Sequence, residues 1–303
     1  LRSDTNVQRC TLSPEETARI FMDYQRRRSL IGIFLSSGVI GTPDRTMERL
    51  NACAAILRYH YHYRGYIHLK IIPGASEAAI DEAMSLATAV SLNIETPGER
   101  HFNRLSHCKD YERDIIAPLK FMAEQTAPGQ PHRRVKCTTQ FIVGASDEND
   151  SEIVRYMDGI YNRLRFERIY FSAYQPGLGA GDIPGEQRFD LAPEARFTRE
   201  HRLYQADFLL RQYGFKTDEL VFDRTGNFSL DQDPKEAWAA RHPEFFPVGI
   251  NRADREMLLR VPGLGPVSVE KVIMQRRYRR IGSLADLGIK GKLAEKAAAY
   301  LFF

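Results

Sequence analysis

The chain has 303 residues, of which 43% are hydrophobic and 27% charged, and its formal net charge is +4. This composition excludes a disordered or fibrous chain, and the length allows one large domain or two unequal ones. No apolar run reaches the ~20 residues of a membrane-spanning helix, and the first residues show no secretory signal pattern.

Helical and strand patterns alternate through the first 193 residues. A capping box at Ser13 and Glu16, with Pro14 between them, predicts a helix that ends near Arg28. Further helices are predicted at 45–59, 76–87, 111–125, 148–163 and, after a Gly/Pro-rich loop at 175–193, at 198–213. Strands are predicted at 31–36, 66–72, 89–95, 137–144 and 168–174. Strands separated by helices indicate parallel βαβ crossovers.

Several of these strands alternate apolar and polar residues. Strands of a parallel sheet that is covered on both faces usually consist of continuous apolar runs, so the alternation is unusual. The crossover helices must cover the apolar face, which leaves Lys70, Asn93, Glu95 and Gln140 on the other one. We expect that polar face to line an open, concave barrel that holds a polar ligand. The alternative is an ordinary sheet with one solvent-exposed face.

The last part of the chain is more basic than the rest. Residues 251–303 have a charge balance of +6, which leaves −2 for the other residues. Two helical patterns flank Val261-Pro262-Gly263-Leu264-Gly265, and this arrangement resembles the helix-hairpin-helix motif. The resemblance implies that the amides around Gly263 and Gly265 hold a nucleic-acid phosphate, with Lys271 nearby. The alternatives are a solvated basic helix face and a hairpin that binds a protein.

Segments spread over nearly the whole sequence resemble the radical S-adenosylmethionine family, in its branch of DNA modification or repair proteins. Three of them are Phe34-Leu35-Ser36-Ser37-Gly38-Val39, Ser91-Leu92-Asn93-Ile94-Glu95 and Arg241-His242-Pro243-Glu244-Phe245-Phe246-Pro247. The others lie at 66–70, 72–75, 140–145 and 199–207. The resemblance implies a partial (βα)6 barrel that holds a 4Fe-4S cluster and S-adenosylmethionine at its mouth. It also implies a 5′-deoxyadenosyl radical that abstracts hydrogen.

The resemblance has one gap, which concerns the cluster ligands. The family binds its cluster through a CxxxCxxC loop after the first strand, and this sequence has no such spacing. A βα repeat normally begins with a strand, whereas this sequence begins with a loop and a helix. We therefore expect the first strand and the cluster loop before Leu1, and we assign no metal ligand. The alternative is a protein that has lost the cluster.

The four cysteines are widely scattered and have no CxxC spacing, which favours a reducing cytoplasm. They are interpreted as ordinary buried or surface thiols: Cys10, Cys53, Cys108 and Cys137.

Matching the motifs residue by residue implies a set of cofactor-binding positions at strand ends: Ser36, Ser37, Gly38, Lys70, Asn93, Glu95 and Gln140. The serine–glycine segment departs from the family pattern, which usually ends in Glu, and Gln140 replaces a common Gly. Lys70 either neutralises the cofactor carboxylate or pairs with Glu95. His201, Arg202 and Gln205, on the helix after the Gly-rich loop, are candidate substrate contacts or else solvated residues.

The sequence therefore predicts an α/β protein in three parts. A radical S-adenosylmethionine partial barrel occupies 1–193, a linker helix and connecting segment 194–250, and a small all-α helix-hairpin-helix module 251–303. The expected function is radical modification or repair of nucleic acid, with DNA favoured over RNA as the substrate. A flavodoxin or ferredoxin is the expected electron donor. Without its cluster loop we expect this chain to be inactive. The alternatives are a non-catalytic nucleic-acid-binding scaffold and a radical enzyme that acts on a protein or small molecule.

Overall fold

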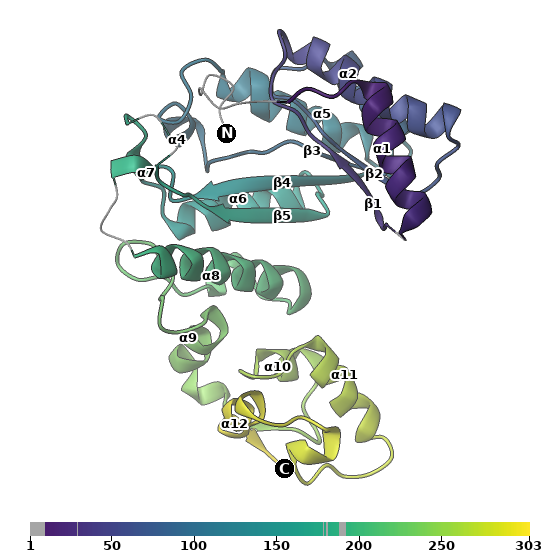
Figure 1. Cartoon of the computed structure of the whole chain (residues 1–303). Coiled ribbons are helices and arrows are strands. Elements are labelled where there is room, and N and C mark those ends of the chain that lie inside the picture. The colour runs from purple at the N-terminus through teal and green to yellow at the C-terminus, as the bar shows by residue number, and fades with distance from the viewer. Residues whose placement is uncertain (1–9, 29, 178, 180, 188–191) are drawn as a thin grey trace. The chain divides into compact units, whose positions relative to one another are not determined.

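The computed structural model describes residues 10–28, 30–177, 179, 181–187 and 192–303. The chain forms two compact units, of which the first contains 1–148 and 156–192 and the second contains 149–155 and 193–303 (Figure 1). None of the helices among the described residues is long and apolar enough to cross a membrane. The assignment of functions to the three predicted parts stays a prediction.

The first unit is built on a five-stranded parallel sheet that curls into a half-barrel. Its strands follow each other in chain order, β1-β2-β3-β4-β5. They are β1 Gly32–Leu35, β2 Tyr66–Lys70, β3 Ala89–Ser91, β4 Lys136–Val143 and β5 Arg168–Ala173. The α/β class and the parallel crossovers predicted from the sequence are confirmed.

Helices of the first unit alternate with these strands. They are α1 Pro14–Arg27, α2 Pro43–Ala55, α3 Glu77–Leu86, α4 Glu99–Phe102, α5 Ala117–Gln125, α6 Asp150–Asn162 and α7 Pro184–Gln187. Residues 150–155, at the start of α6, belong to the second unit. The predicted capping box is present: Glu16 N donates to Ser13 Oγ and Ser13 N donates to Glu16 Oε2. The α4 and α7 helices were not predicted. Part of the predicted loop 175–193 lies outside the described residues.

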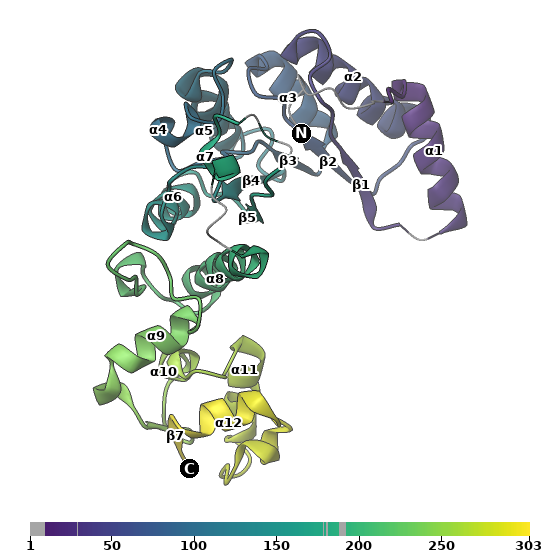
Figure 2. The same ribbon diagram turned by 60° about the vertical axis from the view of Figure 1, so that its left-hand side comes forward.

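The core of the first unit lies between the apolar face of the sheet and its crossover helices. Ile67, Leu69, Val90, Phe141 and Ile169 are fully buried there. Figures 1 and 2 show α2, α3 and α5 along this face of the sheet. Period-two alternation therefore placed the apolar residues correctly.

One strand differs from the prediction. The strand expected at 89–95 ends at Ser91, and the next pairing to β4 joins Glu95 to Phe141. Ser91 pairs with Thr138. From there to the Glu95–Phe141 pair, the chain advances four residues on the β3 side but three along β4. The extra residue forms a β-bulge. Thr139 Oγ1 fills the gap, donating to Leu92 O at 2.7 Å and accepting from Ile94 N at 2.9 Å. The two-residue alternation of strand side chains therefore does not apply to the residues after Ser91.

The second unit consists mainly of helices. They are α8 Pro193–Gln212, α9 Pro234–Arg241, α10 Arg255–Arg260, α11 Pro266–Gln275 and α12 Lys292–Ala298, with a 3-10 turn at Leu284–Leu287. The predicted all-α character of 251–303 is not fully correct. A parallel ladder joins β6 Val248–Gly249 to β7 Leu301–Phe302, because Val248 N and Ile250 N donate to carbonyls next to the C-terminus.

Candidate functional site

The cofactor-binding residues predicted from the sequence lie mostly at one edge of the half-barrel. Ser36, Ser37 and Gly38 follow β1, Lys70 ends β2, and Asn93 lies just beyond β3. Parallel strands share their carboxyl edge, so adjacent strands bring these residues to one rim. Ligands of open α/β sheets bind at this edge. Gln140 lies farther back, in the middle of β4.

The polar residues of the strands share the face opposite the apolar core. In the strand register Phe34 pairs with His68, Lys70 with Ser91, and Ser91 with Thr138, which in turn pairs with Arg168. Paired residues of parallel strands point to the same face. The face of the sheet opposite the apolar core is therefore mostly polar, as the alternation predicted, although it also has the exposed Phe34.

Buried polar atoms without a partner concentrate on this face and its rim. Within the described residues, four such atoms come from β2, β4, β5 and the segment after β3: His68 Nε2, Thr138 Oγ1, Arg168 Nε and Glu95 Oε2. Each unsatisfied buried group costs about 1–3 kcal/mol. A polar ligand that bonded to some of these atoms would offset that cost.

Glu95 is unusual among the rim residues. Its φ of 65° lies in the left-handed region, which a non-glycine residue rarely adopts. Burial raises the pKa of its carboxyl group, while Lys70, Lys109 and the Asn93 side chain act in the opposite direction. The side chain of Lys70 forms no ion pair or hydrogen bond within the described part of the chain. The structural Lys70–Glu95 ion pair, one of the two alternatives, is therefore not formed.

His68 extends the polar face toward the middle of the sheet. Its Nδ1 lies 3.4 Å from Tyr66 Oη, and its ring meets Phe34 edge-on with centroids 4.7 Å apart. Burial and the neighbouring Lys70 lower its pKa to about 4. The imidazole is thus neutral at physiological pH. The alternation placed His68 on this face but assigned it no role.

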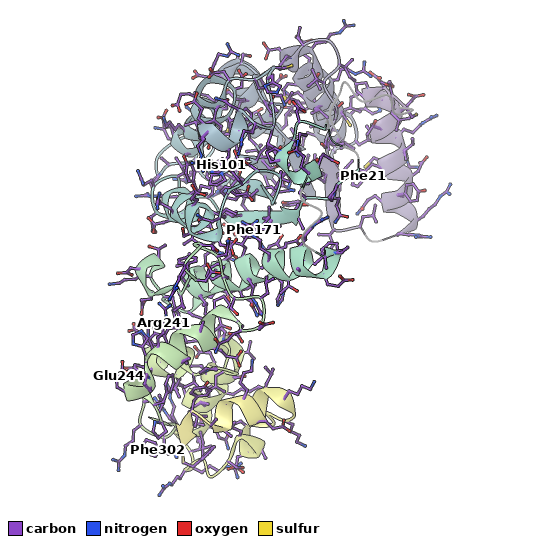
Figure 3. The ribbon with its side chains drawn as sticks, turned by 90° about the vertical axis from the view of Figure 1, so that its left-hand side faces the viewer. Phe21, His101, Phe171, Arg241, Glu244 and Phe302 are labelled. Atoms are coloured by element: carbon purple, nitrogen blue, oxygen red, sulfur yellow. The ribbon has the colours of Figure 1, made fainter. Side chains whose placement is uncertain are left out.

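A second polar network lies just after β4 and was missed from the sequence. His101 of α4, labelled in Figure 3, has Nδ1 2.9 Å from Ser146 Oγ and 3.2 Å from Asp147 Oδ1. Burial raises the pKa of Asp147, but hydrogen bonds from Arg104 and Ser146 outweigh it and hold that pKa well below its usual range. Serine and aspartate contact the same ring nitrogen, so this is not a nucleophile–base–acid relay. His101 and Ser146 are 45 residues apart, so no local sequence pattern indicated that they meet.

The candidate substrate contacts on α8 have mixed surroundings. Arg202 donates to the carbonyl oxygens of Ser229 and Leu230 at 3.1 and 2.7 Å, and to Gln205 Oε1 at 2.8 Å. Arg202 thus ties α8 to a loop of the same unit, and Gln205 contacts Arg202 within the helix. His201 is exposed. A role in substrate binding stays a prediction for all three.

The glycine hairpin between α10 and α11 has the expected local form. Gly263 adopts a φ of 84°, and Gly265 is the N-cap of α11. Val269 N donates to Gly265 O, whereas the described backbone offers no acceptor to the amides of Val267 and Ser268. Unused amides at a helix N-terminus favour an anion.

Two further contacts fix this hairpin. Lys235 Nζ, from α9, donates to Leu264 O at 2.6 Å. A Cβ on Gly263 would lie 2.5 Å from Leu293 O, so the turn packs closely against α12. Gly263 therefore has a packing role besides any role with phosphate. Lys271 is exposed on α11.

The cysteines do not fit an iron–sulfur cluster. Cys10 and Cys108 are exposed, while burial raises the pKa of Cys53 to about 11 and of Cys137 to about 12. A cluster needs thiolates. Across the part of the chain that is described, no three potential metal ligands come together.

Comparison with protein-family models and with curated protein sequences finds no match for this chain.

Proposed function

We propose that the concave face of the first unit binds S-adenosylmethionine and that the second unit binds nucleic-acid phosphate. The chain would then belong to a radical enzyme that modifies or repairs nucleic acid, with DNA favoured over RNA as the substrate. The observation that supports this proposal best is the pair of charged groups at the rim. Glu95 has a buried oxygen without a partner, and Lys70 is likewise unpaired among the described residues.

The charges of the proposed ligand complement this pair. The methionine end of S-adenosylmethionine carries an ammonium and a carboxylate group, which match Glu95 and Lys70. Asn93 and Gln140 are amides suited to ribose hydroxyls or adenine. When bound, the compound supplies a sulfonium whose carbon–sulfur bond an electron can cleave. Because the cysteines do not fit a cluster, the residues described here support binding of the adenosyl compound alone.

Equilibrium dialysis with labelled S-adenosylmethionine tests the first half of the proposal. We expect Glu95→Gln and Lys70→Met each to weaken binding about tenfold, the effect of losing one charge-assisted hydrogen bond. Arg27→Met is the control, because that residue is an exposed cation in the last turn of α1 of the same unit. Wild-type protein that does not bind the compound, or rim variants that bind as well as the control, would contradict the proposal.

Nucleic-acid binding is tested separately on the hairpin. We expect the affinity for a labelled duplex to fall with salt, with a log–log slope of about −0.9 per phosphate contacted. Lys271→Gln should make this slope shallower by about one such contact. Gly263 is unsuitable for this test because a side chain there disrupts packing against α12. An affinity that does not change with salt would favour a protein partner instead.

A further inference from the structure

The first unit has a hollow at the edge opposite the proposed cofactor site. Its volume is about 670 Å³. It lies beside the last turn of α5, the end of α6, the first residues of β4 and the residue before β5. The lining residues fall within 120–127, 133–137 and 163–167. The amino ends of the strands meet here, whereas the candidate cofactor residues follow the carboxyl ends. The two sites are therefore distinct.

The lining of this hollow is strongly basic. It contains six basic and two acidic side chains, an excess as large as the net charge of the whole protein. Lys120 pairs with Glu112 at 2.8 Å and Lys136 with Glu167 at 3.0 Å. The other four have no side-chain hydrogen bond or ion pair within the described residues: Arg133, Arg134, Arg163 and Arg165.

Helix dipoles account for only part of this excess. The carboxyl ends of α5 and α6 lie at the hollow, and each contributes roughly half a negative charge. Together they balance about one of the surplus positive charges. The four unpaired arginines are exposed, so solvent weakens their mutual repulsion, and an anion held between them would weaken it further.

Arg165 also has an unfavourable backbone conformation. Its φ is 55°, at a position just after α6 where Arg163 N and Leu164 N both donate to Gly159 O. Glycine is the usual residue in the left-handed conformation at a helix end, because it has no Cβ to clash. An arginine at this position thus adds a guanidinium group to the hollow at the expense of backbone strain.

We propose that this hollow binds phosphate-ester anions through the four unpaired arginines. A guanidinium group presents two parallel N–H donors that match two oxygens of one phosphate. Ala123, Ala127, Val135 and Leu164 supply an apolar part of the lining, against which the organic portion of the ligand packs. The phosphate belongs either to a free nucleotide or to a nucleic-acid backbone, and these two sources share the same chemistry.

Two probes distinguish the two sources. Binding is measured on the full chain with adenosine triphosphate and with a labelled single-stranded oligonucleotide, in a Lys271→Gln background that weakens the hairpin contribution. We expect the pair Arg163→Gln/Arg165→Gln to weaken at least one probe about tenfold or more. Loss for the nucleotide alone identifies a small ligand, and loss for both identifies phosphate recognition in general. Loss for the oligonucleotide alone identifies a nucleic-acid contact, which would also make the salt dependence shallower by about two phosphates.

A control pair separates local recognition from overall charge. Arg27→Gln/Arg28→Gln removes two exposed charges from the end of α1 and should change neither affinity by more than about twofold. Equal losses in both pairs, or no loss in the Arg163/Arg165 pair, would overturn the proposal. Arg163 and Arg165 are not substituted in the cofactor-binding and hairpin experiments, so the failure of those proposals leaves this result interpretable.

Arg165→Gly is a second test, in which the melting temperature and the phosphate affinity should change in opposite directions. The substitution relieves the left-handed strain, so the melting temperature should rise, while phosphate affinity should fall. An arginine with a purely structural role would give a lower melting temperature and unchanged affinity, and this result would also overturn the proposal.

Discussion

The most strained of the rim residues is Glu95. Its carboxyl group is buried beside a bulge, and its backbone is left-handed. Burial disfavours the ionised form, which raises the pKa above the unfolded value of about 4.5. Such a group lowers the stability of the folded protein as pH rises above the unfolded pKa, because the unfolded chain releases its proton more readily.

Glu95→Gln should therefore stabilise the ligand-free protein at neutral pH. We expect a gain of about 1–3 kcal/mol in the free energy of unfolding. The gain should disappear below pH ~4.5, where the carboxyl group is protonated in both states. Urea unfolding followed by circular dichroism at several pH values measures this. A gain that does not depend on pH would show that the carboxylate is not responsible.

Lys235 should make the stability of the second unit depend on pH. Burial lowers the pKa of Lys235 to about 7, although Asp233 opposes the shift, and the ammonium lies 4.7 Å from the centre of the Tyr213 ring. Between pH ~7 and the unfolded value of ~10.5, the unfolded chain binds the additional proton. Stability should accordingly rise with pH across this window, by at most about 1.4 kcal/mol per unit.

Lys235→Met should abolish that rise, although it also lowers stability by leaving Leu264 O without its donor. Trp238, the only tryptophan, is buried in the same unit and reports unfolding by fluorescence. Lys271→Met is the exposed control and should keep the wild-type slope. An unchanged slope in Lys235→Met would show that another group titrates.

At the scale of elements, the glycine hairpin depends on two glycines in different ways. Gly263 has a φ of 84° and lies against the backbone of α12, whereas Gly265 has an ordinary φ of −104°. Among the described residues, a Cβ on Gly265 would meet the hydroxyl group of Tyr213 at 3.2 Å and no other atom within 4 Å. The sequence pattern treated the two as equivalent, but their surroundings make them unequal.

Gly263→Ala should destabilise the second unit by about 2 kcal/mol or more, because the new Cβ adds steric overlap to left-handed strain. Gly265→Ala should cost less than about 1 kcal/mol, since Tyr213 can shift slightly. Thermal unfolding followed by Trp238 fluorescence compares the two. Equal losses would mean that the close contact with α12 is not formed in solution.

At the scale of the whole molecule, the second unit includes a segment far from the rest of it in sequence. Asp150 is fully buried, with Oδ1 2.7 Å from Arg199 Nε and Oδ2 accepting from Phe228 N at 2.9 Å. A buried carboxylate that pairs with a guanidinium and a backbone amide is satisfied only as long as all partners are present. Residues 149–155 are therefore part of the fold of this unit.

Asp150→Ala should lower the free energy of unfolding of the second unit by about 3–5 kcal/mol, because it removes the buried carboxylate that accepts from both Arg199 Nε and Phe228 N. Asp231→Ala, which removes an exposed carboxylate from the same unit, should change stability by less than about 0.5 kcal/mol. Urea titration with Trp238 fluorescence distinguishes the two. A small effect of Asp150→Ala would show that residues 149–155 do not stabilise this unit.

The sequence by itself determined the elements with strong local signals. The capping box of α1, the five strands and the assignment of apolar residues to one face of the sheet follow from hydrogen-bond chemistry at helix ends and from the two-residue period of strands. The glycine order around Gly263 likewise predicted a tight turn. These features depend on neighbouring residues, so they can be derived without knowing what packs against them.

Only the tertiary structure decided which distant groups meet. The bulge before Glu95 arises because Thr139 of the next strand inserts its hydroxyl between Leu92 and Ile94. The ladder between β6 and β7, the network around His101 and the arginine-lined hollow combine segments with no sequence signal in common. These contacts join particular residues far apart in the chain, and a local pattern does not specify which distant residue each of them meets.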